Sequence, residues 1–394
     1  MTANNSSKDE GSSQELYHSQ KERLKGNRTV DDLSEAISPD RFSAWYQERQ
    51  FRQNIENGQP YFNSSSPVPE PTRHSPSNLL QCHRKLYYRQ YNAPEEQSDP
   101  DGIYWFGTRF EEDIICPFLE RAVTGPDTYV RNSIWVDFTV ETQGLDIQIK
   151  GVTDPVMVDS KSVPILPTEI KSKSSVEGLK SPNKQHRAQI HAYMAGLSTK
   201  YEIQVRDAIL IYGSRNSFRI NPFHIEFDEE FWETTVLQWA ADHTQYRLNE
   251  QLPPAEPSSS WECKYCDYRE RCGKGNSGFT DIGVSELLPR FVEYPRQNVV
   301  EFLDANPTAR LPPTLAHEYP DLADSYGVYQ WQCPQCSSRF DWDQLEQDSG
   351  NAVEWFCPRC LEQDSLVELQ VPTLSDGLKS TACASNASKG GSQQ

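Results

Sequence analysis

The feature that most constrains this chain is a group of three cysteines in the run WECKYCDYRERC, residues 261–272. Cys263, Cys266 and Cys272 are separated by two and then five residues. Thiolates at such spacings form a cage for a soft metal centre, and such a centre normally takes four protein ligands. A fourth ligand from another part of the sequence would bring that part back onto this one.

Three other unpaired cysteines are candidates for the fourth ligand. Cys383 lies in a polar tail and Cys116 lies beside Pro117 in an expected helix, so each is more simply a free thiol. Cys82 lies in the basic and aromatic stretch LLQCHRKLYYRQY. If Cys82 is the fourth ligand, the four cysteines suit a 4Fe–4S cluster that links the two ends of one domain.

A second group of cysteines lies near the C-terminus as C-P-Q-C and C-P-R-C, twenty residues apart. Two such knuckles place four thiolates in a tetrahedron, which predicts a zinc ribbon formed by Cys333, Cys336, Cys357 and Cys360. The glycine that usually follows each knuckle is replaced by serine and leucine. Two unrelated cysteine pairs in turns, or a single iron in place of zinc, are the alternatives.

Composition restricts the location and the partners. A mean hydropathy of -0.74 and the lack of a long apolar run argue against a membrane span, and the polar N-terminus has no apolar signal region. Because eight of the ten cysteines fall into metal-like groups, we expect a reducing cytoplasm. The net charge of -19, with 23 Arg against 15 Lys, fits a halophilic protein and requires any DNA site to be a local basic patch.

The pattern along the chain predicts a mixed α/β organisation. Alternating stretches at 129–140, 145–158 and 165–171 indicate strands, and 183–197 indicates a helix, so we expect a mixed central sheet flanked by helices. The expected parts are a polar extension at 1–76 with one helix at 39–57, a main domain at 77–275, a linker or helical segment at 276–327, the ribbon at 328–371 and a disordered tail at 372–394.

A candidate reaction centre lies inside the main domain. GVTDPV ends a strand with Asp154, and PTEIKSK places Glu169 and Lys171 two residues apart, so that both side chains leave one face of a strand. Carboxylates on adjacent strands bind a hard cation such as Mg²⁺ or Mn²⁺. Downstream, Gln189 and Tyr193 lie at i and i+4 on one helix face.

Taken together, these motifs resemble the RecB-like iron–sulfur nucleases of the PD-(D/E)xK class over about residues 77–275. The resemblance rests on the Asp154 and Glu169-x-Lys171 elements, on the Q-x3-Y element, and on a lone upstream cysteine followed by Tyr-Tyr. The nearest match is the CRISPR-associated exonuclease family, Cas family four. The resemblance implies a restriction-endonuclease-like core, a 4Fe–4S cluster on the four cysteines, and a cation held close to Lys171.

The chain departs from this family on one helix. GTRFE (107–111) matches a G-x3-H element whose histidine binds metal, but Glu111 takes the histidine position. We expect Glu111 to join Asp154 and Glu169 as a metal ligand, with the adjacent Glu112 as the alternative. Three acidic ligands favour a hard cation.

These features predict a metal-dependent DNA nuclease, a single-strand exonuclease in DNA repair or CRISPR spacer acquisition. The alternatives are a non-catalytic iron–sulfur and zinc nucleic-acid-binding protein, or a nuclease-like subunit of a helicase complex. No G-x4-G-K-[S/T] loop is present, so no nucleotide cofactor is expected. The acidic surroundings of the ribbon favour a protein partner there.

Contacts with single-stranded DNA are expected from two groups of side chains. Stacking on bases is expected from Tyr87, Tyr88, Tyr104, Trp105 and Phe106, with a position in the core as the alternative for each. Phosphate contacts are expected from Arg84, Lys85, Arg89, Lys173, Lys180, Lys184 and Arg187, with a solvated helix start as the alternative for Lys180 and Lys184.

Overall fold

The computed structural model describes residues 67–96, 101–257, 260–276, 281, 286–345 and 355–371, with scattered positions between 37 and 52. The chain divides into two compact units, Met1–Asn63 and Ser64–Gln394. In the first unit, the hydroxyl of Ser38 accepts a hydrogen bond from the backbone N–H of Arg41 at 3.3 Å, as in a helix cap. The described positions of the helix predicted at 39–57, which reach residue 52, are helical, while its other positions and the tail at 372–394 lie outside the described residues.

The second unit is a mixed α/β structure. Its strands are β1 (Arg73–His74), β2 (Thr128–Arg131), β3 (Trp135–Thr142), β4 (Leu145–Val152), β5 (Val156–Asp159), β6 (Pro164–Lys173), β7 (Asp207–Ser214) and β8 (Ile220–Glu226). In the described ranges they form one sheet ordered β1-β4-β3 and another ordered β2-β5-β6-β7-β8. The β6–β7 and β1–β4 pairs are parallel and the others antiparallel. The predicted mixed sheet is confirmed, although β1 begins within the segment predicted as an extension.

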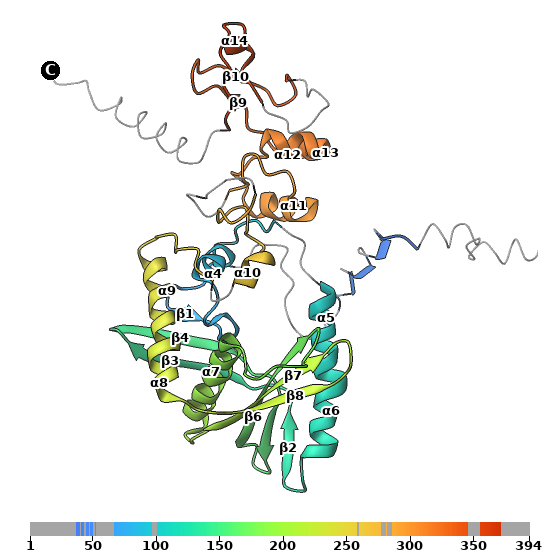
Figure 1. Ribbon diagram of the computed structural model, residues 1–394, viewed down its shortest axis with the longest axis vertical. Coiled ribbons are helices and arrows are strands. Elements are labelled where there is room, and N and C mark those ends of the chain that lie inside the picture. The colour runs from blue at the N-terminus through green and yellow to red at the C-terminus, as the bar shows by residue number, and fades with distance from the viewer. Residues whose placement is uncertain are drawn as a thin grey trace, which may run out of the picture. The chain divides into compact units, whose positions relative to one another are not determined.

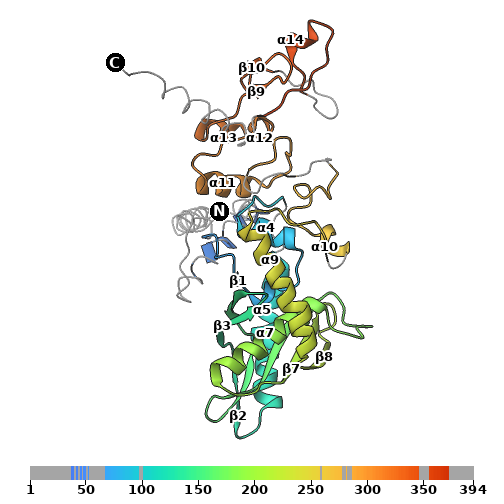
Figure 2. The same ribbon diagram turned by 90° about the vertical axis from the view of Figure 1, so that its left-hand side faces the viewer.

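Helices pack against these sheets or against one another (Figure 1). They are α4 (His83–Gln90), α5 (Asp101–Arg109), η2 (Phe110–Ile115), α6 (Cys116–Phe118), η3 (Leu119–Val123), α7 (Lys184–Tyr201), α8 (Glu229–Phe231), η4 (Trp232–Leu237) and α9 (Gln238–Leu248), with the short η1 (Pro76–Asn78) and α10 (Ser260–Lys264). Helix α7 starts where the side chain of Asn183 accepts a hydrogen bond from the Gln185 N–H. Figures 1 and 2 both show α4 beside α9, and the rings of His83 and Trp239 stack between them at 4.8 Å.

Two stretches predicted as single strands are each divided in the structure. The stretch 129–140 forms β2 and β3, and 145–158 forms β4 and β5, because the chain passes from one sheet to the other at the same point. There the backbone N–H of Ile134 donates to the hydroxyl of Thr153 at 2.9 Å, and the Thr153 N–H donates to the Ile134 carbonyl at 3.0 Å. Asp154 follows Thr153 directly, so the residue predicted to be catalytic lies at this break.

The core lies on both faces of the larger sheet. On one face, α7 contributes Ile190, Met194 and Leu197, each with no exposed surface, against residues of β5, β7 and β8. On the other face, Phe110 and Ile115 of η2 pack against Ile170 and Ile211. Burial on both faces fixes β6, the strand that carries the E-x-K motif, between two helical layers.

The segment after residue 286 has an apolar core of its own. Its helices are α11 (Arg296–Ala305), α12 (Pro313–Glu318) and α13 (Pro320–Ser325), and the ribbon contains β9 (Trp331–Gln332), β10 (Arg339–Phe340) and α14 (Pro358–Leu361). The guanidinium of Arg271, 1 % exposed, joins this segment to the main domain through Asp281, the Glu286 carbonyl and the Tyr294 hydroxyl.

Among the described residues, no helix combines the length and the hydropathy that a membrane span requires.

The contact between η2 and β7 depends on a glycine. A methyl group at Gly213 would overlap the buried ring of Phe110, so we expect Gly213→Ala to lower the free energy of unfolding by about 1–3 kcal/mol. Gly125→Ala is the matched control, because its nearest contact would be an ordinary 3.9 Å to Thr128. Urea denaturation of the three proteins measures the difference, and equal stability of both variants would show that η2 does not pack tightly on β7.

Candidate active site and metal centres

The centre of the candidate site is the carboxylate of Glu169 on β6. The side chain has no exposed surface, and the ammonium of Lys171 lies 2.5 Å from its Oε1. Period-two geometry sends both side chains to the α7 face of the sheet, as predicted. Neither oxygen of Glu169 receives a hydrogen bond in a suitable direction. Burial, followed by the charge of Asp154, raises the pKa of Glu169 to about 8.

Asp154 lies at the break between β4 and β5, beside this pair. Its Oδ2 accepts a hydrogen bond at 2.8 Å from the backbone N–H of Ile170, the residue between Glu169 and Lys171. Burial raises the pKa of Asp154, while Lys171 and the Ile170 N–H act in the opposite direction. The aspartate is therefore tied to the strand that carries the other two groups.

Glu111 reaches the same place from the opposite layer. It lies on η2, a π-helical stretch of a kind that often occurs at functional sites. Burial and the charge of Asp154 raise the pKa of Glu111 to about 8, and Lys171 lowers it. The neighbouring Glu112 is exposed and paired with Arg109 at 2.9 Å. Of the two glutamates that the sequence left open, Glu111 is the one that faces Asp154 and Lys171.

The ammonium of Lys171 responds to all three acids. Burial lowers its pKa, and the charges of Glu169, Asp154 and Glu111 raise it by more, so that the net pKa lies above its ordinary value. Lys171 is therefore a cation at neutral pH. It partly neutralises a group of three buried acids.

Gln189 and Tyr193 lie on the buried face of α7, one turn apart. The side-chain amide of Gln189 donates to the Tyr193 hydroxyl at 2.8 Å. Burial and then the charges of Glu169 and Asp154 raise the pKa of Tyr193 well above its ordinary value, so the hydroxyl stays protonated. This pair borders the acids and keeps a neutral donor beside them.

Two residues near the site were missed at the sequence level, His186 and Tyr212. Nδ1 of His186 lies 2.9 Å from the Tyr212 hydroxyl, which also accepts from the Asn183 N–H. Burial and the charges of Lys171 and Lys173 lower the pKa of His186 to about 3, so the ring is neutral. The ammonium of Lys173 lies 4.9 Å above the Tyr212 ring. His186 could have been found from the sequence, because it lies in the first turn of the helix that follows the E-x-K motif.

The chemistry of these donors fits a divalent cation. Glu169 is a fully buried carboxylate with the Lys171 ammonium at one oxygen, and a hard cation satisfies the remaining acceptor capacity of such a group. The carboxylate oxygens of Glu111, Asp154 and Glu169 do not all lie within 4.8 Å of one another, and Lys171 holds Oε1 of Glu169. A cation that binds all three acids would draw their carboxylates closer together than they lie in this structure.

The cysteines predicted to share a cluster lie around one cavity. Cys82 caps the N-terminus of α4, and it lines this cavity together with Cys263, Cys266 and Cys272. Burial and then the neighbouring thiols raise the pKa of Cys272. The four sulfur atoms are less closely gathered than those of the ribbon. The cavity nevertheless lies where the two ends of the main domain meet.

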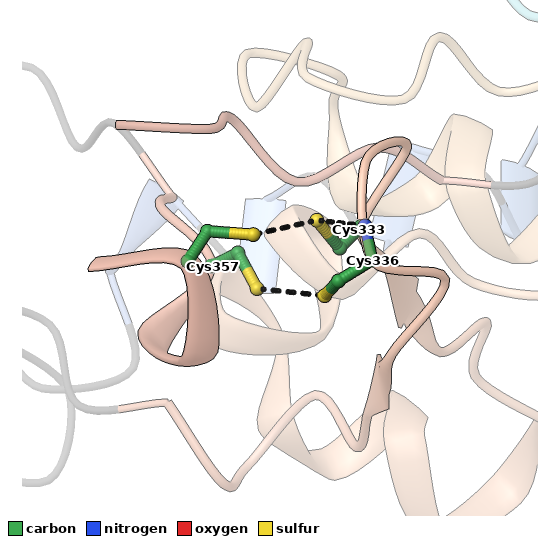
Figure 3. Close-up of side chains that lie close together, drawn as sticks. Cys333, Cys336 and Cys357 are labelled. Atoms are coloured by element: carbon green, nitrogen blue, oxygen red, sulfur yellow. Dashed lines mark hydrogen bonds between the residues drawn. The ribbon is translucent and has the colours of Figure 1, made fainter. Parts of the chain in front are cut away.

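The ribbon cysteines converge on one point (Figure 3). Sγ of Cys333 lies 3.6 Å from Sγ of Cys360, and Sγ of Cys336 lies 3.6 Å from Sγ of Cys357. All four sulfur atoms lie within 4.8 Å of one another. Such a set can hold a tetrahedral metal, zinc or iron.

One further group of donors lies on the surface. Asp207, His224 and Glu226 of β7 and β8 have ligand atoms within 4.8 Å of one another, and all three are exposed. His224 Nε2 is 2.7 Å from the Asp207 carboxylate, an interaction that accounts for the arrangement without a cation.

Several predicted DNA contacts have structural roles instead. Tyr87 and Tyr88 are 3 % and 0 % exposed, so the prediction that they stack on bases is wrong. Lys85 and Arg89 pair with Asp267 at 3.1 and 3.6 Å, and Nε of Arg84 donates to the Pro253 carbonyl at 2.6 Å. These groups hold α4 against the cysteine loop, which is why the stretch is both basic and aromatic.

Other predicted contacts remain available at the surface. Trp105 is 45 % exposed, and Phe106 and Lys173 are half-buried. Arg187 pairs with Asp228 at 2.6 Å, Lys180 and Lys184 lie before and at the start of α7, and the side chain of Tyr104 lies outside the described residues.

The raised pKa of Glu169 predicts a pH dependence of stability. A free glutamate ionises near pH 4.5, whereas Glu169 ionises near 8, so between these values the folded protein holds a proton that the unfolded chain has released. The free energy of unfolding therefore falls as pH rises from 6.5 to 8 without divalent cations. We expect Mn²⁺ to restore it at pH 8, because the cation stabilises the ionised form.

Thermal unfolding of Glu169→Gln and wild type measures this effect. The variant should show a smaller decline, because Glu111, whose pKa is also about 8, remains in it. It should lose the response to Mn²⁺, while Glu112→Gln, at an exposed position, should behave as wild type. An identical pH profile for Glu169→Gln and wild type would contradict the assignment.

Of the comparisons with known proteins, the one with family models identifies a family. No match to a curated protein was found. Among solved structures, the chain resembles one described as "Crystal structure of SSO0001", with 19% sequence identity and a TM-score of 0.40, covering 59% of this chain and 98% of the other, a likeness too distant to support a functional inference. The family described as the PD-(D/E)XK nuclease superfamily matches residues 60–273, more than half of the sequence, including Glu111, Asp154, Glu169 and Lys171. The chain belongs to the PD-(D/E)XK nuclease superfamily.

Proposed function

We propose that this protein is a metal-dependent exonuclease that degrades single-stranded DNA ends, in DNA repair or in CRISPR spacer acquisition. The observation that carries the proposal is the buried Glu169–Lys171 pair, at 2.5 Å, surrounded by two further acids in a chain of nuclease ancestry. Trp105, exposed on the helical segment that continues into Glu111, supports a substrate with unpaired bases.

Glu111, Asp154 and Glu169 would hold the cation. When bound, Mg²⁺ or Mn²⁺ activates water and neutralises charge that develops on the phosphate. The backbone N–H of Ile170 keeps Asp154 oriented towards β6. The helix η2 and the strand β6 are both packed in the core, which holds the acids on rigid elements.

Lys171 would act on the phosphate and on the attacking water. As a cation it favours the negative charge that builds up on the phosphate oxygens, and it can orient the water for in-line attack. Tyr193, kept protonated, can donate to a non-bridging phosphate oxygen while Gln189 fixes the hydroxyl. The neutral His186 adds no positive charge that would compete with Lys171.

Cys82, Cys263, Cys266 and Cys272 would hold a 4Fe–4S cluster with a structural role. The cavity that they line joins α4 to the loop after α10, and adjacent Arg271 carries the contact with the C-terminal segment. A cluster in this position would link three parts of the chain that are distant in sequence. No change of oxidation state is needed for phosphodiester hydrolysis.

The ribbon would hold zinc and recruit a protein partner. Leu361 and Leu366 are exposed on it by 53% and 71%, and the nearby carboxylates of Asp341, Asp343 and Glu362 are exposed as well. An acidic surface with exposed leucines repels phosphate and suits a protein.

Replacing Lys171 tests the enzymatic proposal directly. Protein purified without oxygen should degrade linear single-stranded DNA in Mg²⁺ or Mn²⁺ at high salt, and Lys171→Ala should lower the rate by about 100-fold or more, because a positioned charge and proton-transfer group is lost. Lys161→Ala, on an exposed turn, should retain the wild-type rate.

End labels and a circular strand define the mode of action. An exonuclease leaves a circular single strand of the same sequence intact, and the label released first gives the polarity. A folded wild-type protein that binds DNA and cuts neither form would instead support a non-catalytic binding protein.

Cysteine substitutions test the two metal centres separately. Cys82→Ala should abolish the iron content, about four atoms for each chain, and leave zinc unchanged, because the cluster loses a ligand. Cys357→Ala should abolish zinc and leave iron unchanged. Cys116→Ala removes a buried thiol outside both sets and should change neither in elemental analysis. Loss of both metals in each variant would contradict two separate centres.

A further inference from the structure

The turn between β7 and β8, residues 214–219, is held rigidly by hydrogen bonds. The N–H of Ser214 donates to the Arg219 carbonyl at 2.8 Å, and the Phe218 N–H donates to the Ser214 carbonyl at 3.1 Å. The Ser214 hydroxyl, in a residue 1 % exposed, accepts from the N–H groups of Asn216 and Ser217 at 3.3 and 3.2 Å. A turn with this many internal bonds presents its side chains in fixed directions.

The turn is also attached to the strand that carries the site. The Arg215 N–H donates to the Lys173 carbonyl at 2.8 Å, and the Ser214 hydroxyl lies 3.2 Å from the Ser174 carbonyl. Lys171 lies two residues before Lys173, about 7 Å along β6. The turn therefore lies beside the C-terminal end of β6, just beyond Lys171.

Phe218 projects from this turn. Its side chain is 65% exposed, and its φ of 53° is in the left-handed region, which is rare for an aromatic residue. Strain of this kind is kept where surrounding structure or function requires it. Most of this large ring, in a strained position on a short polar turn, is left open to solvent.

Phe218 contacts the helix that leads to Glu111. Its ring centroid is 6.5 Å from that of Phe106 on α5, and Phe106 stacks on Phe110 at 5.9 Å. Figure 1 shows the β7–β8 end of the sheet beside α5. Phe106 is followed by Glu111 five residues later, and Trp105, 45 % exposed, precedes it. Phe218 thus pairs with Phe106 on the helical segment that continues into Glu111.

Two basic residues share this turn on an acidic protein. Arg215 and Arg219 lie on the same turn as Phe218, and the backbone of Arg215 ties the turn to β6. Arg219 pairs with Glu177 at 3.2 Å, and both side chains are about 70 % exposed, so solvent weakens that pair. Against a net charge of -19, positive charge beside exposed rings matches a nucleic-acid strand.

We propose that the β7–β8 turn is a stacking site for single-stranded DNA, in which Phe218 takes the face of an unpaired base while the basic groups hold the adjacent phosphates. This inference rests on the proposed function and adds the residue that selects unpaired over paired strands. Inside a duplex, each base is covered by its neighbours and offers no free face to Phe218. The occupant is therefore a single strand.

Binding of two labelled single strands tests this proposal. Fluorescence anisotropy is measured for a thymidine oligonucleotide and for an abasic oligonucleotide of equal length, in Ca²⁺ so that cleavage does not interfere. We expect Phe218→Ala to weaken binding of the thymidine strand by about 10-fold, within the usual range for one stacked base, and to leave binding of the abasic strand unchanged. Phe218→Tyr, which keeps a ring, should restore binding.

Tyr129→Ala is the matched control, since Tyr129 is 54% exposed on β2 at the opposite edge of the same sheet. Unchanged thymidine binding in Phe218→Ala would overturn the proposal, and so would an equal loss on both strands, because that loss would come from phosphate contacts or from the fold. This binding measurement does not depend on cleavage, so its result is independent of the activity test with Lys171→Ala. A protein that cuts nothing but shows the Phe218 effect would retain this site and lose the enzymatic proposal.

Discussion

The contact between Lys171 and Glu169 is the interaction on which the rest of the structure depends. A carboxylate with no exposed surface is costly unless a cation compensates it, and two more acids, Asp154 and Glu111, are close enough to raise its pKa. One lysine neutralises such a group only in part. The pKa values near 8 for Glu111 and Glu169 mean that these acids retain protons at neutral pH unless a metal replaces them. A divalent cation would relieve the repulsion among these three acids, and the site is therefore suited to bind one.

The fold produces this arrangement through breaks in regular structure. Asp154 lies where the chain leaves one sheet for the other, and Glu111 lies in a π-helical stretch between α5 and α6. The absence of a side chain at Gly213 lets that stretch approach β7. At the other end of the domain, Glu96 accepts hydrogen bonds from the N–H groups of Glu270 and Arg271, so the loop of three cysteines is fixed beside Cys82. Local irregularity supported by a well-packed core is typical of functional sites.

Much of the site could be predicted because its spacing is local. Glu169 and Lys171 share a strand face, and Gln189 and Tyr193 share a helix face, so period alone brings each pair together. Only the tertiary structure could show which of Glu111 and Glu112 belongs to the site, because the two differ in burial and in their proximity to the charge of Asp154. Alternation also continues through residues 129–140, so the division into β2 and β3 could not be seen. The sequence also did not show that Tyr87 and Tyr88 are buried, because an aromatic pair in a basic helix can either pack in the core or stack on a ligand. Phe218 was overlooked, although a phenylalanine in the polar stretch SRNSFR was a signal of its own.

The most direct measurement is the anomalous diffraction of Mn²⁺ in crystals grown at pH 8. The account predicts a peak beside Glu169 and Asp154, with the ammonium of Lys171 displaced from Oε1 of Glu169. A peak confined to the exposed Asp207, His224 and Glu226 group, with the Lys171–Glu169 contact intact, would contradict it.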